Sequence, residues 1–538
     1  MANLFKKVID RMEWVQVAGA PNAHAAGACM CADMRNDLSR NPFVSTLVSA
    51  TVLNRYNIVT KTSALVQSPA LAGTFGVGAA IAFAPSFGLV GVLAAGNTTS
   101  KVVLSTALPT AVGLNMLANR GGSGEYGFKL RIIDTVVGKT EERWVVGNTA
   151  GTTPTLWIDG TFSFTPSAGA RYEILAGRVF MLGAGTSASN IWRSFEVASN
   201  TLSSGLSFAN LPATIATDSS MMVLDEQYTP YDMVPGEGMV KGEFQYDQGT
   251  VSTRYALAAT ASASGTLTGQ ATLGDSVILA NEYRNFQIRV VQDTVKPTAV
   301  GQRRIIASHT AGPSPVYTLG TAWTVTPSAN AKYVIELPNL ILLRSSATTT
   351  VYTYNYMDAT INNGTNSIAS GAWSTTYFAA AGAANAVGGL WAPSWGIQPD
   401  VGRNARHSFC NFFRGGGSSL DVLDIAGGTT GSWSAAVAYD GAVTFGAGSG
   451  GCYSPFGNEG RMSYLNIYTN GALNQIFRFD SKNRAVSPFT PTDMIQAGTA
   501  AAGNRLAAFC AIDTDAKYDV VLLQSHLSAL MQELIPLV

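Results

Sequence analysis

The chain has 538 residues, more than a single hydrophobic core usually supports, so several structural units are expected. Only 13% of the residues are charged, and 34 Lys and Arg balance 34 Asp and Glu, so the composition offers no electrostatic basis for binding nucleic acid or an anionic membrane. The 55 glycines suit short strands joined by tight turns better than long helices.

The N-terminal segment, MANLFKKVIDRMEW, has neither the apolar core nor the cleavage site of a secretory signal, so export by that route is not expected. The cysteines are few, scattered and odd in number, which predicts reduced thiols instead of a disulfide framework. Cys29 and Cys31 come without the second Cys or His pair of a zinc site, so buried thiols are favoured over metal binding there. The five are Cys29, Cys31, Cys410, Cys452 and Cys510.

The stretch FGVGAAIAFAPSFGLVGVLAAG at 75–96 resembles a membrane span by charge alone, because no residue between Lys61 and Lys101 is ionisable. Four glycines and Pro85 interrupt it, however, and the apolar runs between them have the length of strands. Buried strands are therefore favoured over a span.

Two segments repeat one another. Residues 143–174 align without gaps to residues 304–335 at a constant offset of 161, and twelve of the 32 positions are identical. The identities include an arginine, the tripeptide Thr-Ala-Gly, the loop Thr-Pro-Ser-Ala and a tyrosine. Upstream, YGFKLRIIDTV at 126–136 matches RNFQIRVVQDTV at 284–295 in a shifted register, so the unit is about fifty residues and its length difference falls in a turn.

Alternating apolar residues predict strands in both copies, and the proline predicts that Thr-Pro-Ser-Ala is a loop before a closing strand. The shared residues are a loop proline, small residues and a tyrosine, with no ionisable pair at catalytic spacing. The repeat is therefore interpreted as a structural β-module.

A second pattern recurs along the chain: an aromatic or apolar residue is followed by a short polar or acidic residue and then by a turn. Its spacing is near fifty residues once the second β-module is set aside. This period, with an aromatic-acidic strand end, resembles the blades of kelch-like β-propellers, although the paired glycines of that family are mostly missing here. The steps are Tyr56-Asn57, Phe195-Glu196, Tyr246-Asp247, Tyr354-Asn355, Leu423-Asp424 and Phe479-Asp480.

We therefore predict an all-β fold, a β-propeller of six or seven blades with two homologous inserted β-modules and a short C-terminal helix. MEWVQVA, near the N-terminus, is expected to pair with the last blade, and Leu527, Leu530, Met531 and Leu534 stand at helical spacing. The predicted units are 1–123, an N-terminal segment and first blades; 124–177, β-module copy 1; 178–281, blades; 282–338, β-module copy 2; 339–520, blades; and 521–538, the helix.

Candidate chemical sites are weak, so we expect no catalytic, cofactor-binding or metal site and no enzyme. The histidines, His24, His309, His407 and His526, have no second ligand at a suitable spacing, and His309 is expected in a solvated turn because the other copy has Asn148 there. The carboxylates of DTDAKYD at 513–519 are favoured as a turn over a calcium loop. DIAGGTTGSW at 424–433 faintly resembles the Asp-box of sialidases, which is structural, and Arg403 and Arg406 have no third arginine near them.

The sequences of the two β-modules resemble those of virion structural proteins of tailed bacteriophages. The segments WVQVAGAPNAHAAGACMCADMRNDLSRNPF and AGTAAAGNRLAAF share this resemblance. That resemblance implies a non-enzymatic component, assembled in the host cytoplasm, that forms a homo-oligomer and contacts other virion proteins (portal, tail or capsid). A neck or tail ring component is favoured. Head decoration, an appendage or a receptor- or glycan-binding tail protein are the alternatives. Trp391 and Trp395 could stack on sugars, but core packing is favoured for them.

Overall fold

The computed structural model describes residues 12–17, 29–32, 43–49, 52–57, 62–65, 79–86, 88–109, 112–118, 128–183, 191–199, 201–202, 210–215, 219–226, 232–234, 238–240, 257–269, 279–386, 389–391, 409–438, 444–446, 449–454, 462–469, 473–480, 484–489, 505–510, 519–524 and 531–536. These residues contain no α-helix, and one short 3-10 helix, η2 (Pro297–Ala299). The protein is all-β, as predicted.

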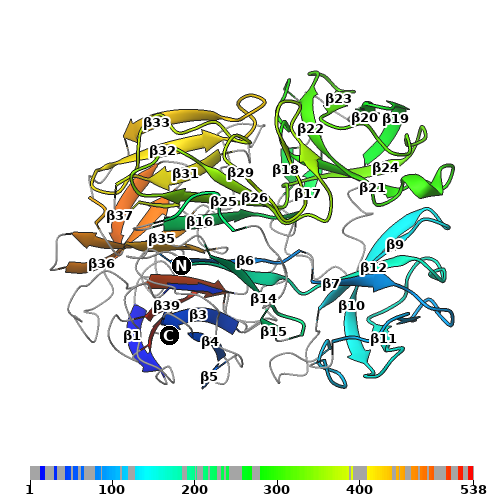
Figure 1. Ribbon diagram of the computed structural model, residues 1–538, viewed down its shortest axis with the longest axis horizontal. Helices are drawn as coiled ribbons and strands as arrows, with labels where there is room; N and C mark the ends of the chain where they lie inside the picture. Colours follow the sequence, from blue (N-terminus) through cyan, green and yellow to red (C-terminus); the bar gives the residue numbers. More distant parts are fainter. Residues whose placement is uncertain are drawn as a thin grey trace, which may run out of the picture.

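Six antiparallel sheets of four strands form the larger part of the molecule, named here the six-sheet body (Figure 1). Sheet 1 is β2 (Cys29–Ala32), β3 (Phe43–Ser49), β4 (Val52–Asn57) and β5 (Thr62–Leu65); sheet 2 is β6 (Ala80–Ala84), β13 (Arg178–Leu182), β14 (Trp192–Glu196) and β15 (Thr201–Leu202). Sheet 3 is β16 (Ser219–Leu224), β25 (Leu340–Ser345), β26 (Tyr352–Asn355) and β29 (Trp373–Ser374); sheet 4 is β30 (Leu390–Trp391), β31 (Phe409–Phe413), β32 (Ser419–Asp424) and β33 (Ser432–Ala438). Sheet 5 is β34 (Gly450–Ser454), β35 (Met462–Thr469), β36 (Leu473–Asp480) and β37 (Ala485–Phe489); sheet 6 is β38 (Arg505–Cys510), β39 (Asp519–Gln524), β40 (Met531–Pro536) and β1 (Met12–Val17).

The first strands of the six sheets contact one another in a closed cycle, in the order β2, β6, β16, β30, β34, β38 and back to β2. Neighbouring sheets also share hydrophobic cores. One core includes buried residues of sheets 1, 2 and 3, a second includes residues of sheets 3 and 4, and a third joins sheets 4 and 5. Sheets 1 to 5 therefore pack on one another through shared cores.

The N-terminal strand pairs with the end of the chain. β1 runs antiparallel to β40, with Trp14 opposite Leu534, so the predicted pairing of MEWVQVA with the last sheet is confirmed. The predicted C-terminal helix is wrong, because residues 531–536 form β40 and 519–524 form β39. A short helix is marginal by its own propensity, whereas β40 has a hydrogen-bonded neighbour on each side, β1 and β39.

The aromatic-polar steps that the sequence showed occupy the same position in successive sheets. Five of the six predicted steps end the third strand of sheets 1 to 5, at the last residues of β4, β14, β26, β32 and β36. The apolar member of each step is fully buried: Tyr56, Phe195, Tyr354, Leu423 and Phe479. The sixth step, Tyr246-Asp247, lies outside the described residues.

Each copy of the repeat belongs to a closed six-stranded sheet. Module 1 consists of β7 (Leu89–Val92), β8 (Lys101–Val103), β9 (Lys129–Asp134), β10 (Lys139–Asn148), β11 (Thr155–Ile158) and β12 (Arg171–Leu175). Module 2 consists of β19 (Leu257–Ala263), β20 (Thr266–Gly269), β21 (Gln287–Gln292), β22 (Arg303–His309), β23 (Val316–Leu319) and β24 (Lys332–Glu336). In module 1 the pairing order is β7-β12-β9-β10-β11-β8, and a bridge between Leu93 and Leu104 closes the cycle. In module 2 the order is β19-β24-β21-β22-β23-β20, and the pairing of β19 with β20 closes it.

The first hairpin of each module, β7 with β8 and β19 with β20, lies upstream of the residues in which the repeat is visible.

Both modules are inserted into the six-sheet body at the same topological place, between the first and second strands of a sheet. Ala84 pairs with Arg178 across module 1, and Leu224 pairs with Leu340 across module 2. In Figure 1 the modules lie to the right of the six sheets, module 2 above module 1. Two further hairpins are β17 (Asp232–Val234) with β18 (Gly238–Val240) and β27 (Ile361–Asn362) with β28 (Ser367–Ile368).

The residues shared by the two copies make the same structural contacts. Arg143 donates from Nε to the carbonyl of Thr161 at 2.9 Å, and Arg304 donates from Nε to the equivalent carbonyl of Ala322 at 2.9 Å. Each guanidinium also lies over the aromatic ring of the residue that follows this carbonyl, which is Phe162 or Trp323.

The Thr-Pro-Ser-Ala loop is held by an aspartate at the end of the first shared strand. Asp134 accepts the backbone N–H of Ser167 at 2.7 Å, and Asp293 accepts that of Ser328 at 2.7 Å. The repeated phrase therefore fixes loops, which agrees with its interpretation as a structural β-module.

Candidate functional site

The most unusual feature of the molecule is a buried group of charges where the two modules meet the six-sheet body. This group, named the ion cluster, contains three arginines and four glutamates: Arg131, Arg289, Arg303, Glu142, Glu173, Glu226 and Glu336. Their formal charges nearly cancel, which is the condition under which buried charges are tolerated.

Arg131 is the centre of the ion cluster. It lies on β9 opposite Glu142 of β10 on one side and Glu173 of β12 on the other. Its guanidinium donates to Glu142 at 2.7 Å, to Glu173 at 2.9 Å and to Glu226 at 2.5 Å, and its side chain is 0% exposed. Three carboxylates thus surround one buried cation.

Glu226 connects both modules to the six-sheet body. It follows β16, and its backbone N–H donates to Asn339 just before β25 at 2.8 Å, so it lies where the chain enters and leaves module 2. Its carboxylate accepts from Arg131 of module 1 and, at 2.8 Å, from Gln287 of module 2. Arg303 of module 2 in turn donates to Glu173 of module 1 at 3.1 Å.

The arginines keep these carboxylates ionised. Burial alone would raise the pKa of Glu173, but Arg303, Arg131 and Arg171 outweigh that penalty and hold its pKa at about 2. The pKa of Glu226 is likewise below its usual range, because Arg131, Arg303 and Arg289 outweigh its burial. The pKa of Glu142 is also lowered, against its burial, mainly by Arg131.

Sequence reasoning did not find the ion cluster. One signal was present: Arg131 and Arg289 occupy the same place in the two aligned strands, each between apolar residues. A charge retained in both copies of an otherwise apolar strand is expected to have a buried partner.

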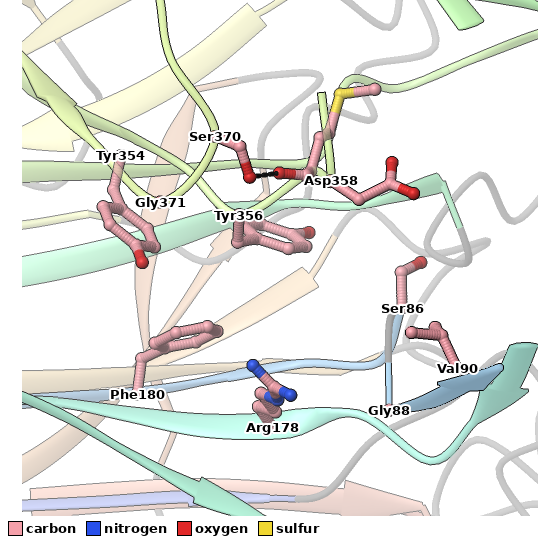
Figure 2. A pocket seen from close by; sticks show the side chains of 11 residues that line it. Ser86, Gly88, Val90, Arg178, Phe180, Tyr354, Tyr356, Asp358, Ser370 and Gly371 are labelled. Atoms are coloured by element: carbon pink, nitrogen blue, oxygen red, sulfur yellow. Dashed lines mark hydrogen bonds between the residues drawn. The ribbon is translucent and has the colours of Figure 1, made fainter. Parts of the chain in front are cut away.

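A pocket of ≈ 190 Å³ lies beside the ion cluster, between sheet 2, sheet 3 and module 1 (Figure 2). Arg178 and Phe180 of β13 face Tyr354 and Tyr356 across it, and Val90 of β7 closes one end. The ring centroid of Phe180 is 5.7 Å from that of Tyr354 and 5.9 Å from that of Tyr356, so the aromatic wall is closely packed.

The polar groups of this pocket are already engaged. Arg178 donates from Nε to Glu196 at 2.8 Å, and Asp358 forms an ion pair with Arg171, which also contacts Glu173 of the ion cluster. The Tyr356 hydroxyl lies 2.6 Å from a carboxylate oxygen of Asp225. The other polar side chains of the lining also have protein partners: the Ser86 hydroxyl donates to Asp225 at 2.7 Å, and the Ser370 hydroxyl donates to the carbonyl of Met357 at 2.6 Å.

His309 is not in a solvated turn, contrary to the prediction. It is buried at the end of β22, and its Nε2 accepts the backbone N–H of Tyr283 at 2.9 Å. Asn148 does the same in module 1, where its Oδ1 accepts the backbone N–H of Leu117 at 2.9 Å. The two side chains differ in sequence but satisfy the same loop, so the position is buried for a hydrogen-bonding reason that periodicity does not reveal.

Substitution of His309 tests this equivalence. We expect His309→Asn to keep the stability of the protein close to wild type, and His309→Ala to cost about 1–3 kcal/mol because the Tyr283 N–H loses its acceptor. Burial lowers the pKa of His309, so the unfolded chain takes up the proton first and wild-type stability should fall as the pH drops below about 6.5. Thermal unfolding at pH 7.5 and pH 5.5 measures both effects. Equal losses for both variants, or a pH dependence that persists in His309→Asn, would contradict the assignment.

The remaining candidates have structural surroundings or lie outside the described residues. Cys29, Cys31 and Cys410 are thiols, and burial raises the pKa of Cys410 above its usual range. Trp391 is buried against Phe412 and Trp433, which confirms packing. The side chains of Cys452 and Cys510, residues 513–518 of the carboxylate-rich segment, and His24, His407, His526, Arg403, Arg406 and Trp395 lie outside the described residues.

Asp424, in the segment that resembles an Asp-box, accepts the N–H of Ala426 in a turn. The stretch that resembles a membrane span contains two strands, as predicted, but only β6 is buried at every position; β7 exposes Val90 and Val92. In the part of the chain that the structure describes, no three Cys, His, Asp or Glu side chains are grouped as metal ligands. The same residues include no helix with the length and apolar character to cross a membrane.

No family model and no curated protein matches this chain. Among solved structures, an auxiliary nutrient binding protein from Bacteroides ovatus is similar at 11% identity, with 82% of this chain and 96% of that chain covered and a TM-score of 0.23. Saccharomyces cerevisiae Sqt1 is similar at 8% identity, with 97% and 98% covered and a TM-score of 0.26. A Niastella koreensis GH74 enzyme matches at 10% identity, with 92% and 66% covered and a TM-score of 0.18. Similarities of this size support no argument about fold or function.

Proposed function

We propose that the six-sheet body is a six-bladed β-propeller, with each sheet as one blade. The closed cycle of first strands supports this arrangement, as does the pairing of β1 with the last sheet. The recurrence of a buried aromatic or leucine at the end of the third strand supports it as well. In this arrangement modules 1 and 2 project from two neighbouring blades.

We further propose that the protein is a non-enzymatic structural component of a tailed-phage virion, acting through oligomeric assembly. One observation is the main support for assembly: among the residues whose side-chain exposure the structure describes, a set that includes none of sheet 6, all eight exposed large hydrophobic side chains belong to the modules. They are Val90, Val92, Leu114, Val136, Val146, Trp157, Leu279 and Val295. Exposed apolar side chains concentrated on projecting units mark contact surfaces.

The ion cluster supports the same function. It ties module 1, module 2 and the six-sheet body together through fully buried, charge-assisted hydrogen bonds. An arm used for assembly gains from being rigid, because less freedom is lost when it binds. The pocket, whose charged groups are already paired, offers no comparable support for catalysis.

The resemblance of the repeat to phage virion proteins favours a neck or tail ring, assembled in the host cytoplasm with portal, tail or capsid proteins as partners. Head decoration, an appendage and a glycan-binding tail protein remain the alternative roles. Trp391, one of the two tryptophans considered for sugar stacking, is buried and unavailable for it.

The experiment is a mass measurement on the purified full chain, combined with antibody labelling of phage particles. We expect a defined homo-oligomer and label at the neck or tail. A chain that stays monomeric at all concentrations and is absent from particles would overturn the proposal. A monomer that binds or cleaves glycans would favour the glycan-binding alternative.

A further inference from the structure

Three large apolar side chains of module 1 are exposed on neighbouring segments of the chain. Leu114, Val146 and Trp157 are 67%, 45% and 41% exposed. Gly147, which pairs with Trp157 across β10 and β11, links them: a Cβ there would lie 3.3 Å from the indole ring and 3.4 Å from Asn115, the residue after Leu114. These three side chains are named the apolar face.

The equivalent positions of module 2 are small or polar. The repeat aligns Val146 with Ala307 and Trp157 with Thr318. Leu114 corresponds to Ala280, because the residues after them make matching bonds: the Asn115 N–H donates to Asn148, and the Asn281 N–H donates to His309. Two copies of one module therefore differ systematically at this surface.

In module 2 the chain itself covers part of this surface. The hairpin of β27 and β28 packs on β22, where a Cβ at Gly364 would lie 2.9 Å from the Ala307 side chain. Ile361 and Ile368 of this hairpin are buried. In module 2, therefore, the small Ala307 lies under the β27–β28 hairpin. At the equivalent position module 1 has the larger Val146, which is exposed. Exposure of this kind is costly unless another surface covers it.

We propose that the apolar face of module 1 is covered by a second copy of this chain. The charges around the apolar face balance, which favours a second copy of this chain over a strongly charged partner. Lys101 pairs with Trp157 across β8 and β11, and Asp159 follows two residues later, so one positive and one negative group flank the indole. In a two-fold contact, Lys101 of one copy can meet Asp159 of the other, and the face is complementary to itself. This inference rests on the proposed assembly function and names the surface that performs it.

The test replaces the apolar face with the residues that module 2 uses. The variant Leu114→Ala, Val146→Ala and Trp157→Thr introduces side chains that the homologous module already tolerates, so folding should be retained and is checked by circular dichroism and thermal unfolding. Sedimentation of the full chain over a range of concentrations should show self-association for wild type, and at least about tenfold weaker self-association for the variant.

The matched control is Val295→Thr, which removes a valine that is 73% exposed on module 2, away from the apolar face. It should associate like wild type. If wild type and the triple variant self-associate equally, the apolar face is not the contact, while the proposed assembly function survives. If folded wild type stays monomeric throughout, a second copy does not cover the face, and the assembly function fails with it unless particles contain the protein.

Discussion

Replacing Arg131 by methionine is expected to lower the free energy of opening module 1 by about 3–5 kcal/mol. The side chain is 0% exposed and forms ion pairs with Glu142, Glu173 and Glu226. Methionine keeps much of the volume but none of the charge, so buried carboxylates would lose their main donor. The loss comes mostly from leaving anions unpaired, because a buried ion pair contributes little net stability when intact.

Hydrogen exchange of the β9 and β12 amides measures this effect without assuming that a chain of 538 residues unfolds in one step. Protection should fall by about a hundredfold or more in Arg131→Met. Arg171→Met is the matched control, because Arg171 is 39% exposed at the edge of the ion cluster and should cost about 1 kcal/mol or less. Similar losses in the two variants would show that the ion cluster does not hold the module.

Acid is expected to weaken the same junction. The pKa of Glu173 is about 2 in the folded protein and about 4.5 when unfolded, so its contribution is complete above about pH 5 and is lost as the pH falls towards 2. A depression of this size corresponds to roughly 3 kcal/mol for this fully buried carboxylate. Glu226 and Glu142, whose pKa values are also lowered, act in the same direction.

Thermal unfolding between pH 6 and pH 3 measures this dependence. The wild-type midpoint should decrease steeply below pH 5, because the unfolded chain takes up protons that the folded chain does not. Glu173→Gln should begin less stable and show a shallower decrease, since it lacks one of the titrating groups. An identical slope in the variant would remove Glu173 from the explanation. The variant His309→Asn separates this decrease from the one expected of His309, which begins as the pH falls below about 6.5.

The sequence predicted much of the local structure. Period-two alternation found the strands of the repeated units, and the proline of Thr-Pro-Ser-Ala correctly indicated a loop. The aromatic-polar steps found the ends of third strands, because a buried aromatic residue followed by a turn-forming polar residue is a local requirement of that position. These features depend on neighbours in sequence, which a single chain displays directly.

The C-terminal helix and the position of His309 were wrong for one reason. Both depend on partners distant in the chain: β40 is fixed by β1, which lies more than 500 residues away, and His309 is fixed by the loop that contains Tyr283. The first hairpin of each module was not predicted as part of the repeat, because pairing with β12 or β24 and packing in the same core require apolar residues but no particular ones.

The ion cluster and the apolar face were decided by tertiary structure alone. Arg131 and Val146 both belong to strands in which alternation predicts only that one side faces the interior of the module. Whether the other side meets glutamates, a hairpin or solvent depends on what the fold places there. The sequence by itself determined an all-β chain with two copies of one structural module. Only the three-dimensional packing decided that Arg131 is buried among carboxylates, and that Val146 of module 1 is exposed where the equivalent Ala307 of module 2 lies under the β27–β28 hairpin.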